Sequence, residues 1–239
     1  MKKLVAISLF VFLYLSSTAQ FSVSAKYSLN SFPEWEEIID GSTIPNTGFI
    51  GDGAEYGFSY WFRLKNYRVE FLPEISFQSL KSENEAFQTH GFEKTSYYLN
   101  LTTQIYTLDI EGDCNCPTWG KDGNFIQKGF FVGINPSIGY HKLDIVDNEI
   151  AAGSQSSNKI NLRLGVSTGL DIGIAKWITL TPFAALNYTP GLGWDNLENI
   201  ASGGAIPQAE DKTKIWAVQP GIRLMFRPDY LKEQRGMFR

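Results

Sequence analysis

Eight stretches of the chain alternate apolar with polar residues, which is the pattern of β-strands that have one apolar face. In the clearest stretch, from Ile160 to Ile174, Ile, Leu or Val fills all but one of the alternate positions. Apart from the N-terminus, no stretch has the 3.6-residue period of an amphipathic helix, so we predict an all-β protein. The eight predicted strands are residues 21–29, 54–64, 68–78, 97–105, 130–140, 160–174, 178–188 and 216–226.

Eight such strands can close into a barrel with the apolar face inward, as in soluble lipocalin-like proteins, or outward toward lipid. The polar face consists mainly of Gly, Ser, Thr and Asn, which fit a narrow interior, and its charges nearly balance. We therefore predict an eight-stranded antiparallel transmembrane up-and-down β-barrel, with the soluble barrel as the alternative. The predicted interior polar network comprises Lys26, Glu55, Arg63, Arg68, Glu70, Glu74, Arg163, Asp171 and Arg223.

Connections between the predicted strands alternate in length, as in outer-membrane barrels with short periplasmic turns and long extracellular loops. Residues 65–66 and 175–177 are tight turns, whereas the turn 109–128 falls on the short side and yet is long. The predicted long loops are 30–53, 80–93, 142–159 and 189–212. Aromatic residues near strand ends are typical of membrane interfaces, and here they are Tyr67, Trp177, Tyr188, Trp216 and Phe226.

The N-terminus has the features of a secretory signal peptide. Lys2 and Lys3 precede a mostly apolar run at 4–15, and small residues permit cleavage after Ala19. An uncleaved anchor helix is the alternative, but this run is shorter than the roughly 20 residues that span a bilayer. We therefore expect an exported outer-membrane protein with a signal peptide at 1–19, a barrel at 20–227 and a periplasmic tail at 228–239.

Composition narrows the classes of protein and partner. The chain has 239 residues, of which 43% are hydrophobic, 14% aromatic and 19% charged, and this excludes disordered, collagen-like and coiled-coil chains. The 21 basic and 25 acidic residues give a net charge of −4. Without Lys2 and Lys3, 19 basic residues remain against 25 acidic ones, a net charge of −6, which argues against binding to nucleic acid.

Three short segments carry a family resemblance: Asp-Cys-Asn-Cys-Pro at 113–117, Lys-Gly-Phe-Phe at 128–131 and Asn-Pro-Ser-Ile-Gly-Tyr at 135–140. With the signal peptide and the eight alternating stretches, they resemble the small outer-membrane barrels that form the membrane part of OmpA and OmpX. The chain is most similar to the "outer membrane beta-barrel protein" families of Bacteroidetes. This resemblance implies a fold and a membrane, while activity stays open. The chain departs from the usual pattern by continuing 13 residues beyond Phe226.

The interior charges are expected to pair with one another, because an unpaired buried charge is costly. An eight-stranded interior is just wide enough for side chains, so we expect a filled barrel. No catalytic residue is predicted, and the alternative is a lipid A esterase-like site with His141 and a nearby serine. His90 lies in a predicted loop. No metal or other cofactor is expected, since Asp144, Asp147 and Glu149 lack the ligand order of a calcium loop.

Cys114 and Cys116 are the only two cysteines. Their spacing differs from the Cys-x-x-Cys redox motif, and two ligands without a nearby His cannot complete a zinc site. In an oxidising periplasm they either join in a small, strained ring or stay reduced. We interpret them as bracing the long turn 109–128, with a redox role as the alternative.

The remaining chemistry lies in the connections, where exposed aromatic and acidic residues are typical of partner-binding surfaces. Packing over the barrel mouth is the alternative use of the same side chains. We predict a non-enzymatic barrel that contacts outer-membrane lipid and binds a protein partner, as a scaffold or subunit of an envelope assembly that serves secretion in some relatives. A lipid-modifying enzyme and a narrow channel are the alternatives. The candidate partner-binding residues are Trp35, Glu36, Glu37, Trp119 and Trp194.

Overall fold

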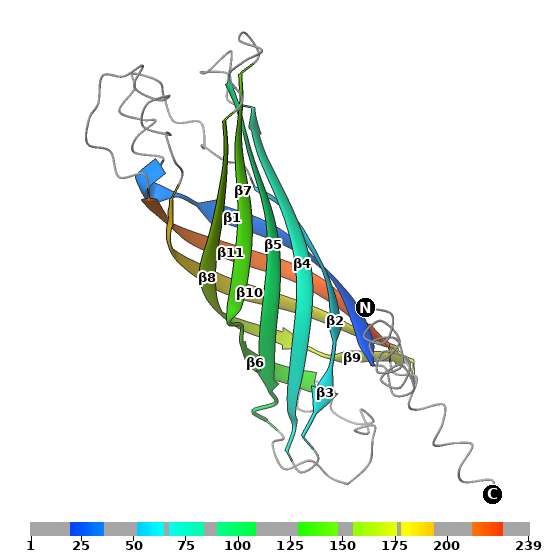
Figure 1. Ribbon diagram of the computed structural model, residues 1–239. Helices are drawn as coiled ribbons and strands as arrows, with labels where there is room; N and C mark the ends of the chain where they lie inside the picture. Colours follow the sequence, from blue (N-terminus) through cyan, green and yellow to red (C-terminus); the bar gives the residue numbers. More distant parts are fainter. Residues whose placement is uncertain are drawn as a thin grey trace, which may run out of the picture.

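The computed structural model describes residues 20–35, 52–64, 67–83, 90–108, 129–147, 155–175, 178–193 and 212–226. These residues form an all-β structure in which every strand pairing is antiparallel. Its strands are β1 (Phe21–Ser31), β2 (Gly53–Tyr60), β3 (Phe62–Arg63), β4 (Val69–Glu83), β5 (His90–Ile105), β6 (Phe130–Ile134), β7 (Ser137–Asp147), β8 (Gln155–Leu170), β9 (Ile172–Ala175), β10 (Ile178–Gly193) and β11 (Lys212–Phe226) (Figure 1).

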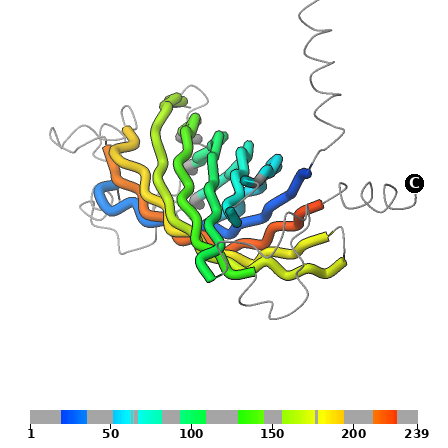
Figure 2. The backbone as a smooth tube through the Cα atoms, turned by 90° about the horizontal axis from the view of Figure 1, so that it is seen from below, coloured from blue at the N-terminus to red at the C-terminus, as the bar shows by residue number. Residues whose placement is uncertain are grey.

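The strand pairings return to their starting point. β1 pairs with β2 on one side and with β11, the last strand, on the other. The remaining pairings run from β2 through β4, β5, β6 and β7, β8 and β10 to β11. Figure 1 shows β4, β5, β7 and β8 on the near side with β10, β11 and β1 crossing behind them, and Figure 2 shows β1 and β11 lying side by side. The first and last strands of the chain therefore close the sheet.

The structure divides the eight predicted stretches into eleven strands, because three stretches are interrupted. Trp61 separates β2 from β3, Asn135 and Pro136 separate β6 from β7, and Asp171 separates β8 from β9. Both members of each pair keep a common neighbour, which is β4, β5 and β10 respectively. Pro136 has no N–H to donate to a strand ladder, which explains one of the interruptions. The alternation pattern predicts which face of the sheet each side chain occupies, but it does not predict such interruptions.

Along most of the wall, polar side chains face the interior and apolar ones face the outside. In β1, Ser22, Ser24, Lys26 and Ser28 are buried while the residues between them are exposed. The same facing on the other strands exposes many large apolar side chains, including Phe58, Ile75, Leu99, Ile138, Ile160, Leu164, Val166 and Ile222. This arrangement is the inverse of a soluble barrel, so the lipocalin-like alternative is wrong in its facing.

The sheet closes unevenly. The β4–β5 ladder continues from Val69↔Ile105 to Glu83↔Gly91, whereas β8 and β10 pair only from Phe183↔Gly169 to Tyr188↔Leu164. Beyond that point a register shift follows Thr189 in β10. The side chain of Asn161 then spans the two strands by donating from Nδ2 to the backbone oxygen of Pro190 at 2.8 Å.

Several strands are longer than predicted and extend into segments that we expected to be loops. The β4–β5 hairpin reaches Glu83 and His90, and β7 and β8 reach Asp147 and Gln155. These extensions carry fewer apolar residues than the predicted stretches, although Leu80 of β4 and Leu143 of β7 are buried. The signal peptide 1–19, the tail 228–239 and most of the predicted long connections lie outside the described residues. Within the described ranges, no helix has the length and apolar character needed to cross a membrane.

Candidate functional site

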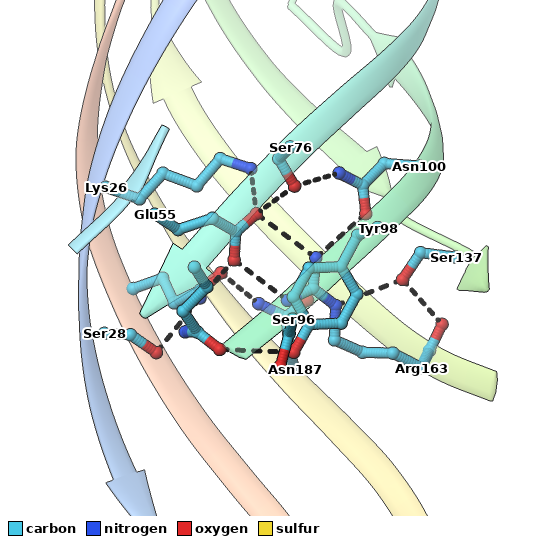
Figure 3. Close-up of polar contacts among 12 residues, drawn as sticks. Lys26, Ser28, Glu55, Ser76, Ser96, Tyr98, Asn100, Ser137, Arg163 and Asn187 are labelled. Carbon is cyan, nitrogen blue, oxygen red and sulfur yellow. Dashed lines mark hydrogen bonds and ion pairs between the residues drawn. The ribbon is translucent and has the colours of Figure 1, made fainter. Parts of the chain in front are cut away.

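An ion-pair cluster occupies the middle of the interior. Lys26 of β1 and Glu55 of β2 are cross-strand partners, and Lys26 Nζ lies 2.8 Å from Glu55 Oε1. The same ammonium group lies 2.6 Å from Oε1 of Glu74 on β4. Because all three side chains are at least nine-tenths buried, one lysine bridges two carboxylates out of contact with bulk water. Figure 3 shows Lys26 and Glu55 pointing toward one another.

Arg163 of β8 reaches this cluster from another part of the wall (Figure 3). Its Nη1 donates to Glu55 Oε2 at 3.0 Å, and its Nη2 donates to Asn100 Oδ1 at 2.8 Å. The guanidinium also lies 3.6 Å from the ring centroid of Tyr98, a cation–π contact. Arg163 therefore links β8 to β2 and β5 through the interior.

Neutral side chains satisfy the remaining acceptors. Gln219 Nε2 donates to Glu55 Oε2 at 2.9 Å, and Asn187 Nδ2 donates to Gln219 Oε1 at 2.7 Å. Asn100 Nδ2 donates to Glu74 Oε1 at 3.0 Å. Such bonds offset the cost of burying charge, which ion pairing alone often fails to do. We call Lys26, Glu55, Glu74, Asn100, Arg163, Asn187 and Gln219 the central network.

A second polar group, which we call the lower cluster, lies nearer the end of the barrel where β1 begins. The Tyr106 hydroxyl lies 2.6 Å from Asp171 Oδ2 and 3.0 Å from Glu70 Oε2. Thr181 Oγ1 donates to the other carboxylate oxygen of Asp171 at 2.5 Å. The Arg68 guanidinium lies 5.0 Å from the ring centroid of Tyr106. The interruption between β8 and β9 thus places a carboxylate where Tyr106, which follows β5, and Thr181 of β10 both contact it.

Apolar side chains fill the interior beside the lower cluster. Trp61, at the break between β2 and β3, packs with Leu72 and Met225 and is 1% exposed. Tyr106, Phe131 and Phe183 form a second buried group. Polar and apolar layers therefore both fill the interior, in keeping with the narrow interior of a barrel of this size.

At the opposite end, His141 points into the barrel. It is 1% exposed, and its Nδ1 lies 2.9 Å from Oγ of the equally buried Ser96. The sequence allows an esterase-like site with His141 and a nearby serine, and the structure encloses His141 and Ser96 inside the barrel. The side chain of His90, which we expected in a loop, lies outside the described residues, although its backbone belongs to β5.

The start of the first connection packs beside the beginning of β11. Phe32 and Trp35 are both fully buried, with ring centroids 5.6 Å apart. Glu34 Oε2 accepts hydrogen bonds from Thr213 Oγ1 at 2.8 Å and from the backbone N–H of Lys214 at 2.9 Å. Partial burial alone would raise the pKa of Glu34, but these hydrogen bonds outweigh it and lower the pKa below its ordinary value.

Trp35, a candidate partner-binding residue, is fully buried in the structure. A fully buried ring packs and offers no contact surface, so the alternative of cover over the mouth describes it better. The sequence missed this because an aromatic residue in an acidic loop has no pattern that reports its burial. The other candidate partner-binding residues, Glu36, Glu37, Trp119 and Trp194, and the cysteines Cys114 and Cys116, lie outside the described residues.

Of the nine residues expected in the interior network, eight are buried, and the side chain of Arg63 lies outside the described set. The structure brings Lys26, Glu55, Glu74 and Arg163 into direct contact and gathers Arg68, Glu70 and Asp171 around Tyr106. Sequence reasoning did not single out Asn100, Tyr106, Asn187 or Gln219. Three of these four fall on the polar face of predicted strands, which was the available signal. Among the described residues no cluster of three or more His, Cys, Asp or Glu could hold a metal ion.

Comparisons with known proteins find solved structures that are similar to this chain at low sequence identity. No protein-family model matches it, and neither does any curated protein. Neisserial surface protein A is 10% identical with a TM-score of 0.46, over 87% of this chain and 96% of that one. The attachment invasion locus protein Ail of Yersinia pestis is 14% identical with a TM-score of 0.45, over 87% and 99%. A major outer membrane protein from Thermus thermophilus is 12% identical with a TM-score of 0.44, over the same shares. At these values the likeness assigns neither a family nor a role.

Proposed function

We propose that this chain is an integral outer-membrane β-barrel of eight strands, in which each interrupted pair counts as one strand. The observation that carries the proposal is the facing of the wall: apolar side chains such as Ile75, Leu99 and Ile160 are 67%, 58% and 74% exposed, while charged ones line the interior. Water does not favour such a wall, whereas lipid does. A bacterial outer membrane is where closed β-barrels of this kind occur.

Aromatic and charged residues on the outer wall support a membrane boundary just beyond the aromatic row that contains Phe77. Phe77, Tyr97 and Tyr140 form one cross-strand row and are 40%, 50% and 43% exposed. On the same face of β4, the residues two and four positions after Phe77 are polar. The second of them, Lys81, forms an ion pair with Glu93 at 3.4 Å. Aromatic belts at the edge of an apolar band are typical of membrane interfaces.

We further propose that the barrel acts as a non-enzymatic scaffold or partner-binding subunit of an envelope assembly, with secretion as one such setting. The filled interior supports this role over a channel, because the central network and the Trp61 layer both occupy the axis. The enclosure of His141 and Ser96 leaves a lipid-modifying site at this pair without an approach for a substrate. Partner contact is therefore proposed for the connections expected from the sequence, including 36–51 and 109–128.

The membrane proposal is tested by extraction and folding. The full chain, expressed in a Gram-negative host, should fractionate with the outer membrane and change its gel mobility on heating, as folded barrels do. A protein released by salt or carbonate would contradict the membrane assignment. The scaffold role needs a second experiment: crosslinking in native envelopes, followed by purification under denaturing conditions and identification of stoichiometric partners.

A matched pair of variants separates the scaffold role from a role of the interior. Replacing 113–119 with a Gly/Ser linker should preserve heat-modifiable folding and abolish the crosslinked partner. The control replaces Glu93, a partly exposed residue of β5 that pairs with the exposed Lys81, with Gln and should leave the partner in place. Loss of the partner on substituting Arg163, with retention in the linker variant, would contradict the scaffold proposal and place the activity in the interior.

A further inference from the structure

We propose that the barrel interior holds one small monovalent anion of about chloride size, bound beside Arg223. A cavity at the edge of the central network is lined by Lys26, Glu74, Arg163, Asn187, Gln219 and Arg223, among other side chains. This inference concerns a binding site inside the barrel, whereas the proposed scaffold role resides in the segments outside the membrane.

Arg223 is the buried cation whose hydrogen-bond donors lack acceptors. Its side chain is 4% exposed, and neither Nε nor Nη1 has a hydrogen-bond acceptor. No carboxylate in the described ranges forms an ion pair with it, and it has a close aromatic contact with the ring of Phe183, whose centroid lies 4.9 Å away. A cation–π contact stabilises the charge from one side but supplies no acceptor in the guanidinium plane. Buried polar atoms in this state carry a large desolvation cost.

The balance of buried charge points to a single negative charge. Among the buried side chains that the structure describes, five are cationic: Lys26, Arg68, Lys94, Arg163 and Arg223. Four are carboxylates: Glu55, Glu70, Glu74 and Asp171. Five cations against four carboxylates leave one positive charge in excess. Around the cavity the excess is the same, because Glu74 and the adjacent Glu55 offset two of the three cationic lining residues, Lys26, Arg163 and Arg223.

Size and charge together select the ligand. The cavity volume is about 20 Å³. This is enough for one small ion or one to two waters and too little for a lipid headgroup or sugar. A water molecule would accept from Arg223 but would leave the excess charge in place. A monovalent anion accepts hydrogen bonds from Nε and Nη1 of Arg223 and also neutralises the excess positive charge.

The first test measures how chloride affects the stability of the folded full-length barrel. At constant ionic strength, exchanging sodium gluconate for sodium chloride should raise the heat-modifiable transition temperature, by about 3 °C for each tenfold rise in chloride above its dissociation constant. Arg223→Gln should lose this dependence. Lys214→Gln, which removes an exposed cation from the same strand, should keep it. Equal transitions of the wild type in both salts would overturn the proposal, as would a chloride response that survives Arg223→Gln.

A direct measurement covers the case in which Arg223→Gln fails to fold. Crystals of the wild-type barrel grown in sodium bromide should show one anomalous scattering peak in the cavity, within hydrogen-bond distance of Arg223. A map with a water molecule there and no bromide peak would overturn the proposal. Because the partner capture described above needs no anion, the two proposals can fail independently.

Discussion

Glu55 and Arg163 are 108 positions apart in sequence, yet Arg163 Nη1 donates to Glu55 Oε2 at 3.0 Å inside the barrel. Both side chains are buried, at 0% and 5% exposure. The pair connects β2 to β8 across the interior, so it couples strands that are not neighbours in the sheet. The pair therefore fixes the position of β2 relative to β8 across the interior.

The first prediction is that Arg163→Met strongly destabilises the barrel. Removing the guanidinium leaves Glu55 buried with one counter-charge fewer, and breaking such a pair costs about 3–5 kcal/mol of unfolding free energy. The measurement is the urea dependence of folding into lipid vesicles, followed by tryptophan fluorescence. Glu93→Gln is the control, because its partner Lys81 is 69% exposed at the side chain and surface pairs contribute about 1 kcal/mol or less. Equal losses in both variants would show that the interior pair is no stronger than an exposed one.

The second prediction concerns the facing of β8. Leu164 is 57% exposed on the outer wall, so Leu164→Arg should cost about 2–4 kcal/mol if it meets lipid. The neighbouring Gly165 faces inward, where an added Cβ would lie against the side-chain oxygen of Asn187. Cysteines placed at the two positions should therefore react differently with a lipid-soluble thiol reagent. Reaction at Gly165→Cys with none at Leu164→Cys would invert the assigned register.

How far the sequence predicts this fold can be seen in β1 and β8. Alternation of Ser, Lys and Arg with Val, Tyr and Leu was enough to predict which side chains face inward, because strand periodicity fixes facing directly. The same alternation predicted that Lys26, Glu55 and Arg163 all face the interior. Partners within that set could not be predicted, since they depend on strand tilt and register, which place Arg163 beside Glu55. The burial of Trp35 and the breaks at Trp61 and Asp171 likewise depend on tertiary packing.

The third prediction is that Trp61→Ala weakens the barrel without opening it. The indole packs with Leu72 and Met225, so its removal leaves a cavity and should cost about 3–5 kcal/mol. Ion conductance in planar bilayers should nevertheless stay at the wild-type level, because the central network still occupies the axis. The comparison is Phe62→Ala, which removes a ring from the outer wall, where Phe62 is 45% exposed. An ion conductance in Trp61→Ala above the wild-type level would favour the channel alternative.

The last prediction is a pH-dependent release of the segment that contains Glu34. Its hydrogen bonds from Thr213 and Lys214 lower the pKa of Glu34 below the ordinary value of 4.5. A carboxyl group whose pKa is lower in the folded state stabilises that state above the unfolded pKa, and this contribution is lost as pH falls through the folded pKa. Docking of this segment should therefore be complete at neutral pH and should weaken progressively below about pH 4.5. Trp35 reports it, since release would expose a ring that is now fully buried and shift its fluorescence to the red. In Glu34→Gln the signal of Trp35 should not follow this titration. An acid transition of the same midpoint in Glu34→Gln would assign the titration to another group.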